Sequence, residues 1–140
     1  MRIRWRSGVC GLSVTALALA GAGLAGAAGG GSYRGSTSQR QPVSLTVSSG
    51  AVRSFKIRIL DKCPDGHILR VRARFTSPMT ITNGKFGGTF RPAGAHRGEK
   101  ATLAGMVSGA RATGSFRDVG YSSREHRLCH GSARFTARHL

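Results

Sequence analysis

The chain has 140 residues, of which 22 are lysine or arginine and 5 are aspartate or glutamate, and its formal net charge is +17. This length allows one compact domain. The aromatic content of 6% and the lack of any uninterrupted Leu/Ile/Val/Phe span exclude a polytopic membrane protein, and the lack of a collagen or coiled-coil repeat excludes a fibrous one.

Residues 1–27 have the three parts of a secretory signal peptide. Three arginines in the first six residues give a cationic start, residues 9–24 are apolar, and Ala25-Gly26-Ala27 supplies the small side chains that a signal peptidase accepts. Glycines dilute the apolar run, which favours a cleaved signal over an uncleaved anchor, so we expect no stable membrane span after cleavage. Cleavage would remove three arginines and no acid from the net charge of +17, and would leave +14. We therefore predict a secreted protein, either extracellular or associated with the cell envelope.

Residues 28–41 are rich in Gly, Ser, Thr, Gln and Arg and contain little apolar surface. Such a composition offsets little of the entropy that ordering the segment would cost. The sequence predicts a flexible lead-in at residues 28–41 and a folded domain at residues 42–140.

Apolar and polar residues alternate with a period of two through the predicted domain, which is typical of half-buried strands. In the clearest example, Phe55, Ile57 and Ile59 would face the core while Lys56 and Arg58 face solvent. We expect further strands at residues 43–47, 69–75, 79–82, 85–90, 103–107, 112–116 and 133–138.

Turn residues separate these segments. Pro64-Asp65-Gly66 suits a hairpin connection between residues 55–59 and 69–75. Asn83-Gly84 suits a two-residue turn with positive φ that joins residues 79–82 to residues 85–90, and Ser108-Gly109 suits another turn. About seven short strands at hairpin spacing, with no helical period, predict an all-β fold, either an antiparallel β-sandwich or a small barrel.

Only Cys63 and Cys129 remain after the predicted cleavage, and an even number of cysteines in an exported protein favours a disulfide. Metal binding is the alternative, because three histidines, His67, His126 and His130, lie close to the cysteines in the sequence. The spacing is loose and thiolates persist poorly outside the cell, so we predict the Cys63–Cys129 disulfide, no metal and no cofactor.

The five acids allow two interpretations. Asp61 and Asp65 flank Cys63 and could act as paired carboxylates in acid–base chemistry or as calcium ligands. Glu99, Asp118 and Glu125 have basic neighbours in the sequence and are predicted to form surface ion pairs. A hydrolase could be drawn from His67 or His126, Ser122 or Ser123, and Asp118. No known catalytic motif is present, so we expect a non-catalytic protein.

The outward residues of the predicted hairpin form a basic face. It consists of Lys56, Arg58, Arg70, Arg72 and Arg74. Side chains at i and i+2 on a strand stand roughly 7 Å apart, a spacing that matches successive charges on an extended polymer, and arginine suits bidentate contacts with phosphate or carboxylate. The alternative is a solvated face in an arginine-rich composition. No nucleic-acid motif or outward aromatic platform is predicted, which favours anionic cell-surface polymers over specific nucleic-acid binding.

The layout from about Val52 onward resembles uncharacterised secreted β-domain proteins of high-GC actinobacteria. The resemblance rests on these segments: residues 54–57, Cys63, residues 81–86, residues 112–116 and residues 129–138. It implies export and an all-β domain and assigns no activity. We therefore expect a secreted, disulfide-stabilised β domain that acts by binding or as an envelope component, with a small hydrolase or metal-binding protein as the alternative.

Overall fold

The computed structural model describes residues 29–140; the predicted signal peptide at residues 1–27 lies outside the described residues. The predicted all-β fold is confirmed, since no described residue is helical and all nine elements are strands. The strands are β1 (Gly31–Thr37), β2 (Pro42–Ser48), β3 (Ala51–Lys62), β4 (Ile68–Phe75), β5 (Met79–Thr80), β6 (Lys85–Phe90), β7 (Lys100–Ser108), β8 (Arg111–Ser122) and β9 (Arg127–His139). Among the described residues there is accordingly no helix long and apolar enough to cross a membrane.

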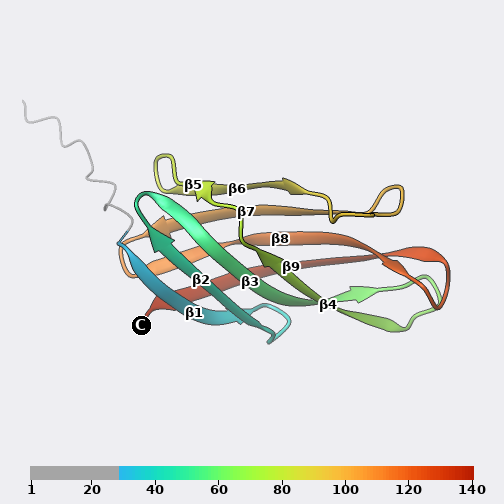
Figure 1. Cartoon of the computed structure of the whole chain (residues 1–140). Helices are drawn as coiled ribbons and strands as arrows, with labels where there is room; N and C mark the ends of the chain where they lie inside the picture. Colours follow the sequence, from blue (N-terminus) through green and yellow to red (C-terminus); the bar gives the residue numbers. More distant parts are fainter. Residues whose placement is uncertain (1–28) are drawn as a thin grey trace, which may run out of the picture.

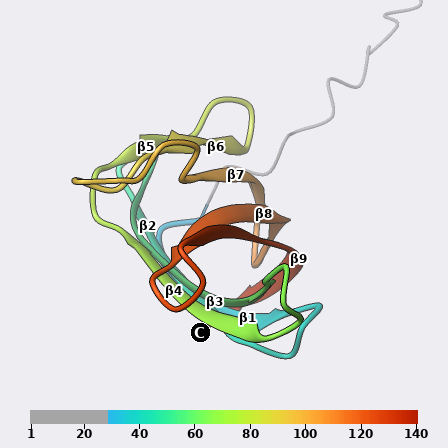
Figure 2. The ribbon, with the colours of Figure 1, turned by 90° about the vertical axis from the view of Figure 1, so that its right-hand side faces the viewer.

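The strands form one antiparallel sheet in the order β4-β3-β2-β1-β9-β8-β7-β6, and β5 pairs with β3 (Figure 1). The sheet curls into a barrel-like shape (Figure 2). β3 and β9 also pair directly, at Lys62 and His130, just beyond the end of the β1–β2 hairpin that separates them elsewhere. β4 and β6 are the two end strands of this order, and they do not pair with each other. The result is a barrel-like sheet that is open along a seam between β4 on one side and β6 with β7 on the other.

The core lies inside the curl and is built by the predicted alternation. All six phenylalanines lie in strands, and Phe55 packs with its ring centroid 5.4 Å from that of Phe135 and 6.3 Å from that of Phe86. Inward residues of β3 are fully buried, whereas the inward residues of the end strand β4 are only half-buried. The difference follows from topology, because no strand covers the free side of β4.

The prediction of a flexible lead-in at residues 28–41 is wrong for residues 31–37, which form β1. β1 pairs with β2 on one side and β9 on the other, so backbone hydrogen bonds order a segment that has little apolar surface. Tyr33 anchors it: its ring is buried, and its hydroxyl lies 2.8 Å from the backbone oxygens of both Gly29 and Gly109, to which it can donate its one proton in turn. The folded domain therefore starts about eleven residues before the predicted boundary.

The Asn83-Gly84 turn has the predicted backbone, with φ of 51° and 78°. The predicted hairpin around it is reduced to one bridge between Thr82 and Lys85. β5 instead pairs with the start of β3, and β6 pairs with β7. The turn thus carries the chain from one side of the curled sheet to the other.

Gln39 fills the junction where β3 and β9 separate to admit the β1–β2 hairpin. Its Oε1 accepts the N–H of Leu60 at 2.8 Å, and its Nε2 donates to the backbone oxygens of Leu60 and Ser132 at 3.0 and 3.3 Å. One side chain therefore supplies the hydrogen bonds that direct strand pairing would otherwise make.

Candidate functional site

The predicted basic face exists as a cross-strand arrangement. In the β3–β4 register Lys56 lies opposite Arg74, and Arg58 lies opposite Arg72. Adjacent strands stand roughly 4.8 Å apart, so cations on β3 and β4 lie within reach of one extended chain. All five predicted residues are exposed.

A shallow hollow of about 590 Å³, here called the outer groove, runs over this face. Its basic lining residues are Arg34, Lys56, Arg58, Arg72 and Arg74, and no acid lines it. Four of the five predicted residues therefore share one groove. Arg70 does not line the outer groove; it lies opposite Leu60, further along β4.

Sequence reasoning missed Arg34, because it placed this residue in a flexible lead-in. The strand register brings Arg34 into the groove: Arg34 lies opposite Ser44, Ser44 opposite Lys56, and Lys56 opposite Arg74. The alternation of exposed Arg34 with buried Tyr33 was the signal that could have found it.

The basic side chains are not neutralised by acids. In the part of the chain that the structure describes, every carboxylate ion pair is with a histidine, and no lysine or arginine nitrogen lies within 4.0 Å of a carboxylate oxygen. The predicted surface pairing of Glu99, Asp118 and Glu125 with basic neighbours is therefore wrong. The physical reason is that all five acids gather at the end of the molecule that holds the disulfide, and their carboxylates point inward or bind backbone groups and histidines.

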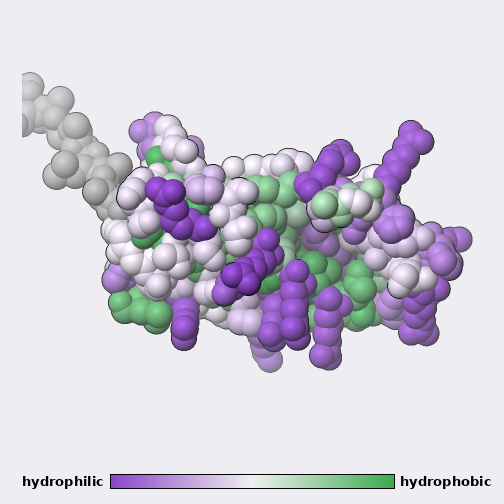
Figure 3. All heavy atoms as spheres, in the orientation of Figure 1, coloured by the Kyte–Doolittle hydropathy of each residue, from purple (hydrophilic) through white to green (hydrophobic). Residues whose placement is uncertain are grey.

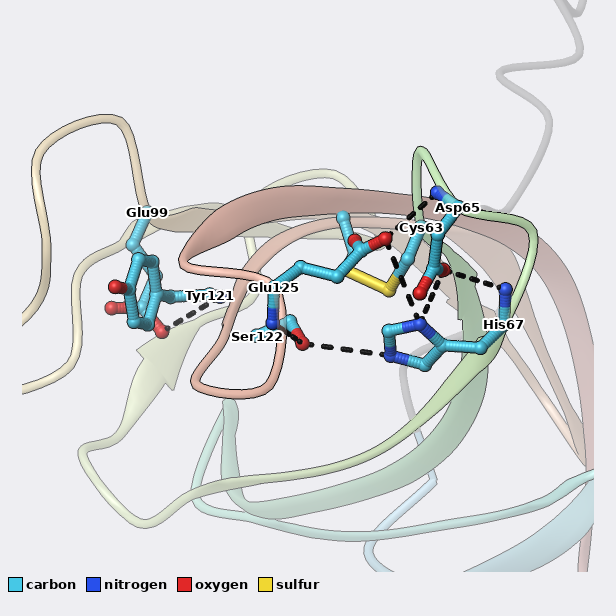
Figure 4. The surroundings of a disulfide bond; sticks show 8 residues. Cys63, Asp65, His67, Glu99, Tyr121, Ser122 and Glu125 are labelled. Carbon is cyan, nitrogen blue, oxygen red and sulfur yellow. Dashed lines mark hydrogen bonds and ion pairs between the residues drawn. A yellow bond between two sulfur atoms is a disulfide. The ribbon is translucent and has the colours of Figure 1, made fainter.

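The predicted Cys63–Cys129 disulfide is present, with Cα atoms 4.3 Å apart (Figure 4). It joins the end of β3 to β9 directly beside the Lys62–His130 pair. It thus fastens the curled sheet where its first and last long strands meet.

Two loops at this end form a hydrogen-bonded network around His67. The His67 Nδ1 contacts the Asp65 carboxylate and lies 3.9 Å from Glu125 Oε1, while Nε2 lies 3.5 Å from Ser122 Oγ (Figure 4). The pKa of Asp65 is lowered to about 2, mainly because its carboxylate accepts a hydrogen bond from the backbone N–H of His67, so this carboxylate stays ionised.

Ser122, His67 and Asp65 contact one another in the order of a serine–histidine–acid catalytic triad. The acid is Asp65 in place of the predicted Asp118. Ser122 is only 2% exposed, so its hydroxyl is closed to a substrate in this conformation. A nucleophile also needs a reacting atom beside it and donors for the developing oxyanion. Neither Ser122 nor His67 lines the outer groove.

The alternative metal site of His67, His126 and His130 does not assemble as predicted. The one group of three or more potential ligands in the described residues consists of Cys63, His67 and Glu125. Cys63 is in the disulfide, so its sulfur is not a thiolate ligand. His126 instead hydrogen-bonds through Nδ1 to the hydroxyl of Tyr121, at 3.1 Å.

Asp61 and Asp118 form a buried carboxyl pair that sequence reasoning did not predict. Asp61 is fully buried, and its Oδ1 lies where a side chain at Gly131 would collide with it. Burial first, and then the neighbouring Asp118 carboxyl, raise the pKa of Asp61 to about 8; burial also raises the pKa of Asp118. The Gly120 N–H lowers the pKa of Asp61 in part but makes no hydrogen bond of normal geometry with it. The Asp61 carboxyl therefore keeps its proton at neutral pH.

These features define an all-β, disulfide-linked domain with a basic groove on its outer surface. Comparison with known protein families, with curated proteins and with solved structures finds no match for the chain. The resemblance to secreted actinobacterial β domains stays a prediction.

Proposed function

We propose that this chain is an exported binding module that holds extended anionic polymers of the cell envelope in its outer groove. The observation that carries the proposal is the groove itself, in which five cations from β1, β3 and β4 line one hollow without an acid. The disulfide is consistent with export, because disulfides persist in oxidising compartments.

The shape and spacing of the groove favour a polymer. Cations on neighbouring strands are roughly 4.8 Å apart, and those at alternate positions on one strand are roughly 7 Å apart. Linear polymers that carry a phosphate or carboxylate on each repeat can meet several of these cations at once. No aromatic residue lines the outer groove, so it has no platform on which bases would stack, and nucleic acid is the weaker candidate.

The test is retention of the purified chain on immobilised linear polyglycerol phosphate and on polygalacturonate, which separate phosphate from carboxylate recognition. The double variant Lys56→Glu/Arg72→Glu should weaken binding by about tenfold or more, since two favourable contacts become repulsive. The matched control Arg117→Glu/Arg134→Glu makes the same charge change on exposed residues of β8 and β9 and should bind like the unmodified chain. Equal losses in both variants would show attraction by net charge alone and would reject the groove.

The Ser122–His67–Asp65 arrangement supports a second candidate, a small hydrolase. It predicts that the chain hydrolyses p-nitrophenyl acetate and that Ser122→Ala abolishes the hydrolysis. Because Ser122 is buried, we expect any slow hydrolysis to be unaffected by this substitution. A rate that depends on Ser122 would replace the binding proposal with a catalytic one.

A further inference from the structure

A second groove, the seam groove, follows the open edge of the sheet. It has a volume of about 560 Å³ and lies between β4 on one side and the end of β6, the start of β7 and β8 on the other. In Figure 3 hydrophobic surface is exposed along the middle of this face, between hydrophilic side chains. The groove exists because β4 and β6 are the two ends of the strand order.

The floor of the seam groove is apolar. Leu69, Val71, Ala73 and Phe75 are the inward residues of β4, and each is half-buried. The ring of Phe75 packs 4.3 Å from that of Phe90, which closes the floor beneath the seam. Surface of this kind is stabilised when further apolar groups cover it.

The edge of β4 offers backbone groups to a partner. β4 is eight residues long and pairs with β3 along its whole length. The N–H and C=O groups of every second residue of β4 point away from β3 and have no strand partner. Long unpaired edges are templates for an added strand. The exposed arginines of β4, at positions 70, 72 and 74, select against a like-charged strand.

We propose that the seam groove binds an extended peptide as an additional strand on β4, with apolar residues on the floor and acidic residues beside Arg70, Arg72 and Arg74. A strand added to β4 has the same alternation, so its outward residues become cross-strand neighbours of the arginines. The charge of the three arginines favours a peptide of alternating apolar and acidic residues, with its acidic residues on the arginine side because Glu99 and Asp118 line the facing wall of the groove.

Two other occupants fit less well. An acyl chain would cover the floor but would leave the edge backbone of β4 without hydrogen-bond partners. A second copy of β4 would place arginine beside arginine across the new pair, which is unfavourable. The two grooves share Arg72, Ala73 and Arg74, whereas Arg34, Lys56 and Arg58 line the outer groove alone, so the two proposals can be tested separately at these unshared residues.

The test uses the folded, oxidised chain and a fluorescent peptide with four Val-Glu repeats, measured by fluorescence anisotropy. Binding should weaken about tenfold or more when the peptide order becomes four valines followed by four glutamates, which keeps the composition but removes the alternation. N-methylation of one alternate set of peptide amides should abolish binding while N-methylation of the other set leaves it, because only one set faces β4.

Two variants separate the grooves. Val71→Phe should fill the floor and weaken peptide binding by about tenfold while polyglycerol phosphate is retained as before, because Val71 lines the seam groove and not the outer groove. Lys56→Glu should weaken polymer retention and leave the peptide bound. Equal binding of the alternating and block peptides, or insensitivity to both N-methylation patterns, would overturn the proposal. Displacement of the peptide by laurate, with no effect of N-methylation, would overturn the proposal and assign the groove to an amphiphile. Dimerisation of the chain in the absence of any peptide would assign the groove to a second copy of the chain.

Discussion

Two of the five acids in this chain lie buried against each other, and this placement makes stability depend on pH. Asp61 is fully buried and Asp118 is 9% exposed, and both have pKa values raised by burial. Gly131 leaves the space that the Asp61 carboxyl occupies. The folded chain therefore keeps a proton that the unfolded chain releases near pH 4.

The free energy of unfolding should fall as pH rises from about 4 to about 8, since a raised pKa in the folded state stabilises it at low pH and this contribution is lost on deprotonation. The fall should be about 1.4 kcal/mol for each pKa unit of the shift. Asp61→Asn should remove most of this dependence in urea unfolding measured across that pH range.

The control for this prediction is Asp65→Asn. The pKa of Asp65 is lowered to about 2, so its contribution is present above pH 4 and is lost only as pH falls toward 2. This variant should keep the slope of the unmodified chain between pH 5 and pH 8. A flat profile for the unmodified chain would contradict the raised pKa of Asp61.

At the scale of elements, two local devices hold the curled sheet together near one point. Gln39 bridges β3 and β9 where the β1–β2 hairpin ends, and the Cys63–Cys129 disulfide joins the same two strands just beyond. Both devices act between strands that are far apart in the sequence. Each can be removed separately.

Gln39→Ala should lower the free energy of unfolding by about 1–3 kcal/mol, because the Leu60 N–H and the two backbone oxygens lose their partner in a partly buried position. Urea unfolding at pH 5 measures the loss. Gln41→Ala is the matched control, since its side chain makes one long hydrogen bond of 3.4 Å. Equal effects of the two substitutions would show that the junction adds no specific stability.

Cys63→Ser/Cys129→Ser should lower the free energy of unfolding by about 4 kcal/mol, because the disulfide closes a loop across a sequence separation of 66. The loss should match that of the unmodified chain after reduction, measured by urea unfolding. A stable reduced chain with an unchanged midpoint would show that the sheet holds its curl without the bond.

At the scale of the whole molecule, the acids are gathered and the basic residues are spread. The five acids lie toward the disulfide end, whereas arginines line the outer groove and the rim of the seam groove and also occur on other strands and loops. Since no described arginine or lysine is paired with a carboxylate, the basic surface is available to an anionic ligand.

Affinity for polyglycerol phosphate should therefore fall by more than about tenfold between 50 and 200 mM salt, as expected when several cations displace counterions. Lys56→Glu/Arg72→Glu should make the logarithmic salt slope shallower by about 2, one for each lost contact. Titrations at four salt concentrations measure the slope. An unchanged slope in this variant would place the polymer elsewhere on the surface.

The sequence by itself determined the strands other than β1, the burial of their phenylalanines, the disulfide and the basic face of the β3–β4 hairpin. These features depend on local alternation, on turn residues and on an even cysteine count, all of which are readable along the chain. Strand order, the Gln39 junction, the place of Arg34 in the outer groove and the Asp61–Asp118 pair were decided only by the tertiary structure. Their physical reason is shared: each depends on contacts between strands distant in the sequence, and β1 in particular is ordered by backbone pairing with β2 and β9 that leaves no mark in its composition.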